Sequence, residues 1–178
     1  MTTLPTATRI AVALGLTGSA WCSGAIMSCS FIAVSALLDP SIPSAATGHT
    51  SIIWQNVYKR GKESIPFVAM STSAAFVYAA CTVPNPLSLE SIQRAKNLLL
   101  FGGLFTVGII PFTLMVMKST NDALHAKAAA VQRRSKEGSV TLLDDGTKEL
   151  ARTWNILNFI RGLFPLAGAF TGICAILF

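Results

Sequence analysis

Charged side chains are scarce in this chain. Only 12% of its 178 residues are charged, whereas about a quarter of the residues of a soluble domain are. Hydrophobic residues make up 52% of the sequence, and the mean hydropathy is +0.56. So little charge cannot cover a water-facing surface of this size. The composition therefore excludes an ordinary soluble domain and predicts a protein that lies in a lipid bilayer.

Metal ligands and cofactor motifs are equally rare. The chain has two histidines, His49 and His125, and four cysteines that stand singly in apolar runs without CxxC spacing. It also lacks HExxH, GxSxG, Walker and dinucleotide-binding motifs, and no pair of acids falls within an apolar run. We therefore predict no metal site and no bound haem or flavin, and we interpret the cysteines as packing residues.

Four apolar segments are long enough to cross a membrane as helices, which takes about 20 residues. The first has no charged side chain between Ile10 and Leu38, which is too long for the core of a signal peptide. We predict an all-α integral membrane protein, an up-down four-helix bundle that forms one domain over residues 1–178. The predicted helices cover residues 10–38, 65–83, 98–117 and 148–178.

The two long connections contain helical patterns of their own. In the first, the spacing of Ile53, Trp54, Val57 and Tyr58 predicts an amphipathic segment before a helix that starts at Pro66. This segment is either an interfacial aromatic belt or a lid over a site between the helix ends. In the second, the third helix is expected to continue to about residue 132, with a turn over residues 133–138. Helix four should start near Lys148, so helices three and four both extend beyond the bilayer.

Basic residues predict the orientation. Three lie on the side of the termini, namely Arg9, Arg94 and Lys96, and ten lie in the two long connections. The positive-inside rule then places both long connections in the cytosol and both termini across an intracellular membrane of the endoplasmic reticulum type. The net charge of +6 is explained by topology and contact with lipid, so no nucleic-acid partner is expected. The Gly168-x3-Gly172 spacing favours close helix packing, within one chain or in a homo-oligomer.

Arg161 is the one basic residue inside an apolar segment, where it costs about 2.5–3.5 kcal/mol near the bilayer centre. It either snorkels to the membrane surface or faces the bundle interior. Trp154, Asn158 and Arg161 share one helix face, with spacings of four and three residues. A face that carries an indole, an amide and a guanidinium predicts an interior position, where each group finds a partner.

A matching polar face lies on helix three, where Thr113, Met117, Asn121 and His125 are spaced by four residues. We expect Asn121 and His125 to meet Asn158 and Arg161, together with Trp54 and Tyr58 from the first connection. The structural alternative is a buried ion pair between Arg161 and Asp122.

Three short motifs lie where helices enter or leave the predicted membrane. They are Trp54-x3-Tyr58-x2-Gly61, Thr120-Asn121-Asp122-x-Leu124 and Trp154-x3-Asn158-x2-Arg161. In this order and spacing they resemble the DUF1772 family of small four-helix membrane proteins, which includes the fungal anthrone oxygenases of aromatic polyketide pathways. The resemblance covers nearly the whole chain, although each motif by itself is short.

The resemblance implies an oxygenase that oxidises an anthrone to an anthraquinone with O₂ and without a cofactor. A base removes a proton from the methylene carbon, and the resulting carbanion passes an electron to O₂. The sequence offers His125 or His49 as the base, although neither histidine belongs to the three motifs. Arg161, Asn158 and Asn121 are expected to hold the oxyanion. The substrate would be bound by Trp54, Tyr58, Trp154 and Asp122.

A second hypothesis is a non-enzymatic member of the same family, a scaffold or a carrier of hydrophobic metabolites. In that case Arg161 serves topology and packing alone. The two hypotheses differ in whether the protein accelerates quinone formation over the spontaneous background.

Overall fold

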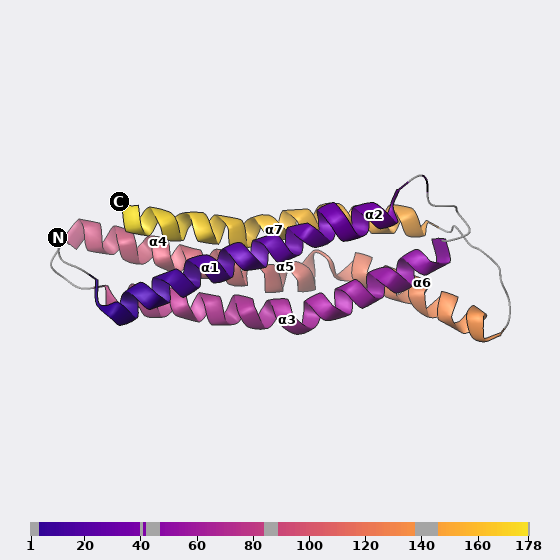
Figure 1. The fold of residues 1–178 in the computed structure, drawn as a ribbon, viewed down its shortest axis with the longest axis horizontal. Coiled ribbons are helices and arrows are strands. Elements are labelled where there is room, and N and C mark those ends of the chain that lie inside the picture. The colour runs from indigo at the N-terminus through magenta and orange to yellow at the C-terminus, as the bar shows by residue number, and fades with distance from the viewer. Residues whose placement is uncertain (1–3, 40, 42–46, 84–88, 138–145, 178) are drawn as a thin grey trace. The chain divides into compact units, whose positions relative to one another are not determined.

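The computed structural model describes residues 4–39, 41, 47–83, 89–137 and 146–177, and all regular structure in these ranges is helical. Figure 1 traces the helices in chain order. The first continuous helical stretch consists of α1 (Thr6–Ser28), a π-helical segment (Cys29–Val34) and α2 (Ser35–Leu37). It is followed by α3 (Thr47–Thr82), α4 (Leu89–Val107), α5 (Ile109–Met115), α6 (Lys118–Lys136) and α7 (Thr147–Leu177).

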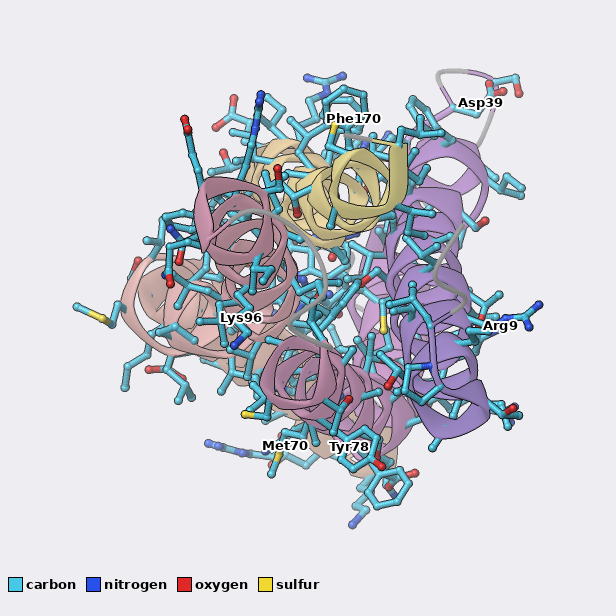
Figure 2. The ribbon with its side chains drawn as sticks, turned by 90° about the vertical axis from the view of Figure 1, so that its left-hand side faces the viewer. Arg9, Asp39, Met70, Tyr78, Lys96 and Phe170 are labelled. Atoms are coloured by element: carbon cyan, nitrogen blue, oxygen red, sulfur yellow. The ribbon has the colours of Figure 1, made fainter. Side chains whose placement is uncertain are left out.

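Four stretches are long and apolar enough to cross a membrane, and they confirm the predicted class of four-helix membrane protein. They are Thr6–Leu37, Thr50–Thr82, Glu90–Met115 and Thr147–Leu177. Only about a third or less of the most apolar window in each is buried inside the protein. Large apolar side chains instead lie on the outside, as Figure 2 shows for Met70, Tyr78 and Phe170. Such a surface suits lipid and does not suit water.

The second membrane helix is longer than predicted. The sequence predicted a separate amphipathic segment and then a helix starting at Pro66, but α3 runs without interruption from Thr47 to Thr82 with Pro66 inside it. Proline removes one backbone hydrogen bond, which would join its nitrogen to the carbonyl of Lys62. Because Lys62 is exposed and Pro66 is only half-buried, water is able to replace that bond, so the helix continues.

The third predicted helix is interrupted twice. α4 ends at Val107, four residues before Pro111, which has no N–H to donate to the Val107 carbonyl. A second break separates α5 from α6, where the backbone N–H of Met117 donates to the carbonyl of Phe112 at 3.3 Å, five residues back. A proline inside an apolar helix favours an interruption, and the first break lies about one turn before Pro111 in the chain.

The extension of the third helix was also underestimated. α6 ends at Lys136, so the turn predicted from Arg133 is wrong at its start. Arg133, Arg134 and Lys136 form the last turn of α6, where cations interact favourably with the negative end of the helix dipole. α7 begins at Thr147, next to the predicted Lys148. Asp144 and Asp145, which by their sequence predict an N-terminal cap for this helix, lie outside the described residues.

The chain folds into two compact units, which we describe separately. Unit 1 consists of residues 1–25, 64–110 and 161–178. Its core surrounds the fully buried Phe76, which lies close to Gly15 and Gly172. The polar groups inside it are paired. The hydroxyls of Ser19 and Thr106 lie 2.5 Å apart, and the Ser23 hydroxyl donates to the Gly162 carbonyl at 2.9 Å.

Unit 2 consists of residues 26–63 and 111–160. Its core is made of Val34, Trp54, Met117, Leu124 and Trp154. Ten of the fourteen basic residues and seven of the eight acidic residues of the chain belong to this unit. Unit 1 holds only Arg9, Arg94, Lys96 and Arg161 among the basic residues. Unit 1 therefore has fewer charged residues than unit 2. The orientation of the chain in the membrane stays a prediction.

Small residues are required where helices of unit 1 approach closely. A Cβ atom on Gly168 would lie 2.7 Å from the carbonyl oxygen of Gly102, whereas a Cβ on the exposed Gly24 would meet nothing within 4 Å. We expect Gly168→Ala to lower the free energy of unfolding by about 1–3 kcal/mol through overpacking. Gly24→Ala should be neutral or stabilising, because alanine favours a helix over glycine. Thermal unfolding in detergent micelles measures both, and equal stability of the two variants would contradict the packing.

Candidate functional site

Four aromatic rings meet in unit 2. The indole of Trp54 stacks on the phenol of Tyr58, with ring centroids 5.3 Å apart, and meets the edge or face of Trp154 at 5.7 Å. The imidazole of His125 lies 5.1 Å from both Trp54 and Tyr58. Trp54 and Trp154 are almost fully buried, whereas Tyr58 and His125 are half-buried. We call these four residues the aromatic cluster. His125 of α6 thus meets Trp54 and Tyr58 of α3, as predicted, and Trp154 of α7 lies beside them.

The helical spacing of each element explains this placement. Trp54 and Tyr58 are four residues apart on α3, so they share one face, and the α6 residues Asn121 and His125 are related in the same way. The buried residues Leu124 and Met117 complete the packing against Trp154. The cluster thus forms where one face of α3 and one face of α6 pack around Trp154 of α7.

The two indole N–H groups of the cluster differ. Trp154 Nε1 donates to Asn121 Oδ1 at 2.9 Å in a buried hydrogen bond. Trp54 Nε1 is buried as well, and it has no acceptor among the described residues. A buried donor without an acceptor costs about 1–3 kcal/mol. Such a group is consistent with a site that receives an acceptor from outside the chain.

His125 contacts one glutamine, which in turn contacts a second. Gln55 Nε2 lies 3.2 Å from His125 Nδ1, and Gln132 Nε2 donates to Gln55 Oε1 at 3.2 Å. An amide nitrogen only donates, so His125 Nδ1 accepts in this arrangement and Nε2 carries the ring proton. The three side chains form one hydrogen-bonded row, which we call the amide relay.

Asn158 is fully buried, as predicted, but its amide nitrogen is engaged by the protein. Its Nδ2 donates to the carbonyl of Ile26 at 2.9 Å and to the hydroxyl of Ser30 at 2.8 Å. Ser30 belongs to the π-helical segment, a rare geometry that is frequent at functional sites. The Ser30 hydroxyl also reaches the carbonyl of Asn155 at 3.3 Å. Asn158 therefore fastens α7 to the first helical stretch, and both hydrogens of its amide are used there.

Asp122 lies away from the cluster. Its carboxylate is exposed and accepts from Lys118 Nζ at 2.6 Å, one turn earlier on α6. The carboxylate of Asp122 raises the pKa of Lys118 through this hydrogen bond. The sequence suggested a buried ion pair between Arg161 and Asp122, but the Asp122 carboxylate is exposed, so it is not the buried partner that was expected. The exposed position of Asp122 does not support its predicted role in substrate binding.

Two predicted residues are not placed at the cluster. Arg161 belongs to unit 1 and is half-buried, with its Nε atom shielded from solvent. His49 falls in the first turn of α3, but its side chain lies outside the described residues. The contributions of both to a site remain predictions.

Charged residues flank the cluster along two of its helices. On α3 the exposed residues Lys59, Arg60, Lys62 and Glu63 directly follow Tyr58 and precede the apolar stretch that ends at Thr82. On α6 the exposed Lys118 and Asp122 precede His125. Exposed charges mark the edge of the surface that lipid covers. Along the chain, exposed charged residues therefore lie next to cluster residues on both helices.

Sequence reasoning missed three residues, namely Gln55, Gln132 and Ser30. Gln55 follows Trp54 directly and Gln132 lies two helical turns after His125, so both are near predicted residues. A glutamine in a helix is ordinary, however, and nothing in its spacing marks a partner. Ser30 lies within an apolar run that gave no sign of the π-helical turn.

Comparisons of the whole sequence with known proteins identify similar chains. A family model described as anthrone oxygenase matches residues 54–171. The anthrone oxygenase encC of Aspergillus fumigatus is 32% identical over 93% of this chain and 91% of its own length. The anthrone oxygenase AgnL2 of Paecilomyces divaricatus is 32% identical over 88% of each chain. The noranthrone monooxygenase of Aspergillus flavus is 29% identical over 90% of this chain and 70% of its own length. No solved structure matches the chain.

The two tryptophans of the cluster give a matched test of its hydrogen bonding. Trp154→Phe removes the donor to Asn121 and leaves a buried acceptor unpaired, so it should cost about 1–3 kcal/mol more than the loss of ring volume. Trp54→Phe loses a similar ring volume and no hydrogen bond. We expect Trp154→Phe to unfold at the lower temperature in detergent micelles. A Trp54→Phe variant that is equally or more destabilised would contradict the hydrogen bond.

Proposed function

This chain belongs to the anthrone oxygenase family, and we propose that it oxidises an anthrone-type aromatic polyketide to the anthraquinone with O₂. The observation that supports the proposal is the aromatic cluster, in which a half-buried histidine lies against the rings of Trp54 and Tyr58. Flat apolar surfaces bind a flat tricyclic substrate, and an imidazole beside them is suited to remove a proton.

The reaction needs no electrons beyond those of the substrate. The anthrone loses both hydrogens of its methylene carbon and gains one oxygen atom, and the second atom of O₂ leaves as water. Oxidation of a methylene to a carbonyl releases four electrons, and O₂ takes up four. A base that removes the first proton gives a carbanion delocalised over both rings and the carbonyl oxygen. This carbanion passes an electron to O₂, and the two radicals combine to a peroxide that loses water.

His125 is the proposed base. Its ring stands between the aromatic rings on one side and the amide relay on the other. Imidazole is the side chain that most often acts as a general base in enzymes. His49 is the competing candidate for the base. The activities of variants at the two histidines distinguish between them.

Asn121 and Trp54 are the proposed donors to the oxyanion. The Trp154 indole occupies Asn121 Oδ1, which orients the amide and leaves its N–H₂ group as the part that addresses a ligand. Trp54 Nε1 is the buried donor without an acceptor among the described residues. Donors set in place before the reaction stabilise developing charge because they do not have to reorganise. Arg161 remains a predicted further donor, whereas Asn158 is committed to packing.

The membrane setting suits both reactants. Anthrones and O₂ partition into lipid, and the cluster lies next to the charged residues that bound the apolar part of α3. We propose that the substrate reaches the cluster from the bilayer. The distribution of basic residues supports an orientation with both long connections in the cytosol.

The role of His125 is tested by purifying the protein in detergent and measuring quinone formation from emodin anthrone under air. His125→Gln should lower kcat by about 10² to 10⁴, the usual contribution of a general base. His49→Gln is the matched variant and should keep kcat within about twofold. A loss confined to His49→Gln would transfer the role to His49. Wild-type protein no faster than the spontaneous oxidation would favour the non-enzymatic scaffold or carrier.

Cofactor independence is a separate prediction. Because the substrate supplies all four electrons, we expect O₂ consumption and quinone formation to be unchanged after dialysis against a metal chelator. The purified protein should also show no flavin or haem absorption. A rate that falls with chelator and recovers with one added metal would contradict this part of the proposal and leave the overall reaction intact.

A further inference from the structure

We propose that Gln55 and Gln132 are positioning residues that hold His125 in each protonation state it passes through. The inference deepens the proposed function, since it rests on His125 as the base. It starts from the amide relay, in which Gln132 donates to Gln55 and Gln55 approaches His125 Nδ1, each at 3.2 Å.

The relay assigns the reactive atom of the ring. Gln55 covers Nδ1, so a substrate proton is accepted by Nε2. With Gln55 Nε2 facing Nδ1, the neutral ring accepts at Nδ1 and therefore carries its proton on Nε2. In this tautomer Nε2 cannot accept the substrate proton, because it already carries the ring proton. Nε2 becomes a base only when the ring proton has moved to Nδ1. A proton on Nδ1 then requires an acceptor at the position of the Gln55 amide.

A primary amide meets both requirements at one position. Rotating the Gln55 amide by half a turn places Oε1 against Nδ1–H and turns Nε2 toward Gln132. Gln132 is exposed, so its own amide is able to turn, and water is able to replace it. The same arrangement satisfies the imidazolium that forms when Nε2 takes up the substrate proton. A carboxylate at position 55 can only accept, so it forms a hydrogen bond with the ring only when Nδ1 carries a proton. A hydrocarbon side chain forms no hydrogen bond with either state of the ring.

The surroundings of His125 contain other groups that could affect its titration. Tyr58 of α3 is titratable and contacts the ring directly, and Trp54, which also touches it, is neutral. Through Trp54 the cluster continues to Trp154 of α7, which is neutral too. On α6 itself, Asp122 lies one turn before His125 and is paired with Lys118. Gln55 is the side chain that approaches Nδ1, so substitution at position 55 is the sharpest test.

The experiment measures the ring itself and, separately, the reaction. In a His49→Gln background only one histidine remains, so ¹⁵N NMR of labelled protein in micelles reports the tautomer and pKa of His125. We expect Gln55→Glu to raise this pKa by about 1 unit, since a carboxylate favours the charged ring. It should also place the proton of the neutral ring on Nδ1. In Gln55→Met the hydrogen bond to Nδ1 is lost, so the neutral ring should no longer favour one tautomer through this contact.

The pH profile of the reaction should follow. A raised pKa keeps the base protonated to higher pH, so the rising limb of kcat/KM moves up by the same amount in Gln55→Glu. For Gln55→Met we expect kcat to fall about tenfold or more, with KM nearly unchanged. Gln93→Glu is the control, since Gln93 is an exposed glutamine of α4 that donates to Asn97, and it should move neither quantity.

The outcomes separate the two proposals. A His125 pKa and tautomer unchanged in both Gln55 variants would overturn the relay. If Gln55→Glu does not fold, the exposed Gln132→Glu replaces it, with a smaller rise in the same pKa expected, and no rise would overturn the relay as well. A shifted His125 pKa with an unmoved pH profile would support the relay and refute His125 as the base.

Discussion

The contact between Trp54 and Trp154 is the interaction on which unit 2 depends. Both indoles are almost fully buried, and they are the largest side chains of that core. Each also fixes a second element, because Trp154 donates to Asn121 of α6 and Trp54 stacks against Tyr58 and His125. One aromatic pair thereby joins α3, α6 and α7. The position of the histidine follows from this packing, so the residues of the proposed site are also residues that stabilise the core.

The cluster gives His125 two different sides. The imidazole contacts the rings of Trp54 and Tyr58, and its Nδ1 atom lies next to the Gln55 amide. In the proposed reaction the substrate is apolar and the first step moves a proton, so both kinds of neighbour have a part. The proposed oxidation of the methylene balances with O₂ alone, and it asks of the protein only binding, proton removal and stabilisation of the oxyanion.

Several features of the site could be predicted from spacing. Trp154 and Asn158 lie four residues apart and are both buried, and the same holds for Met117 and Asn121. Residues with this spacing share one helix face, and a face that carries polar groups in an apolar helix turns toward the interior. Two expectations were wrong for local reasons. Pro66 did not start a helix, since a single lost hydrogen bond can be replaced by water at an exposed turn. Asp122 did not join Arg161 in a buried pair, since Lys118 lies one turn away in water.

Hydropathy and helical period are properties of neighbouring residues, and they determined the four membrane helices, the class of the fold and the buried faces. The partners of the polar groups depend on how each helix is rotated and shifted against the others. Gln55 and His125 are 70 positions apart in the chain, and Asn121 and Trp154 are 33 positions apart, so only the packing of the helices brings each pair within hydrogen-bond distance. For this reason the amide relay, the buried donor of Trp54 and the structural use of Asn158 became visible only in the folded chain.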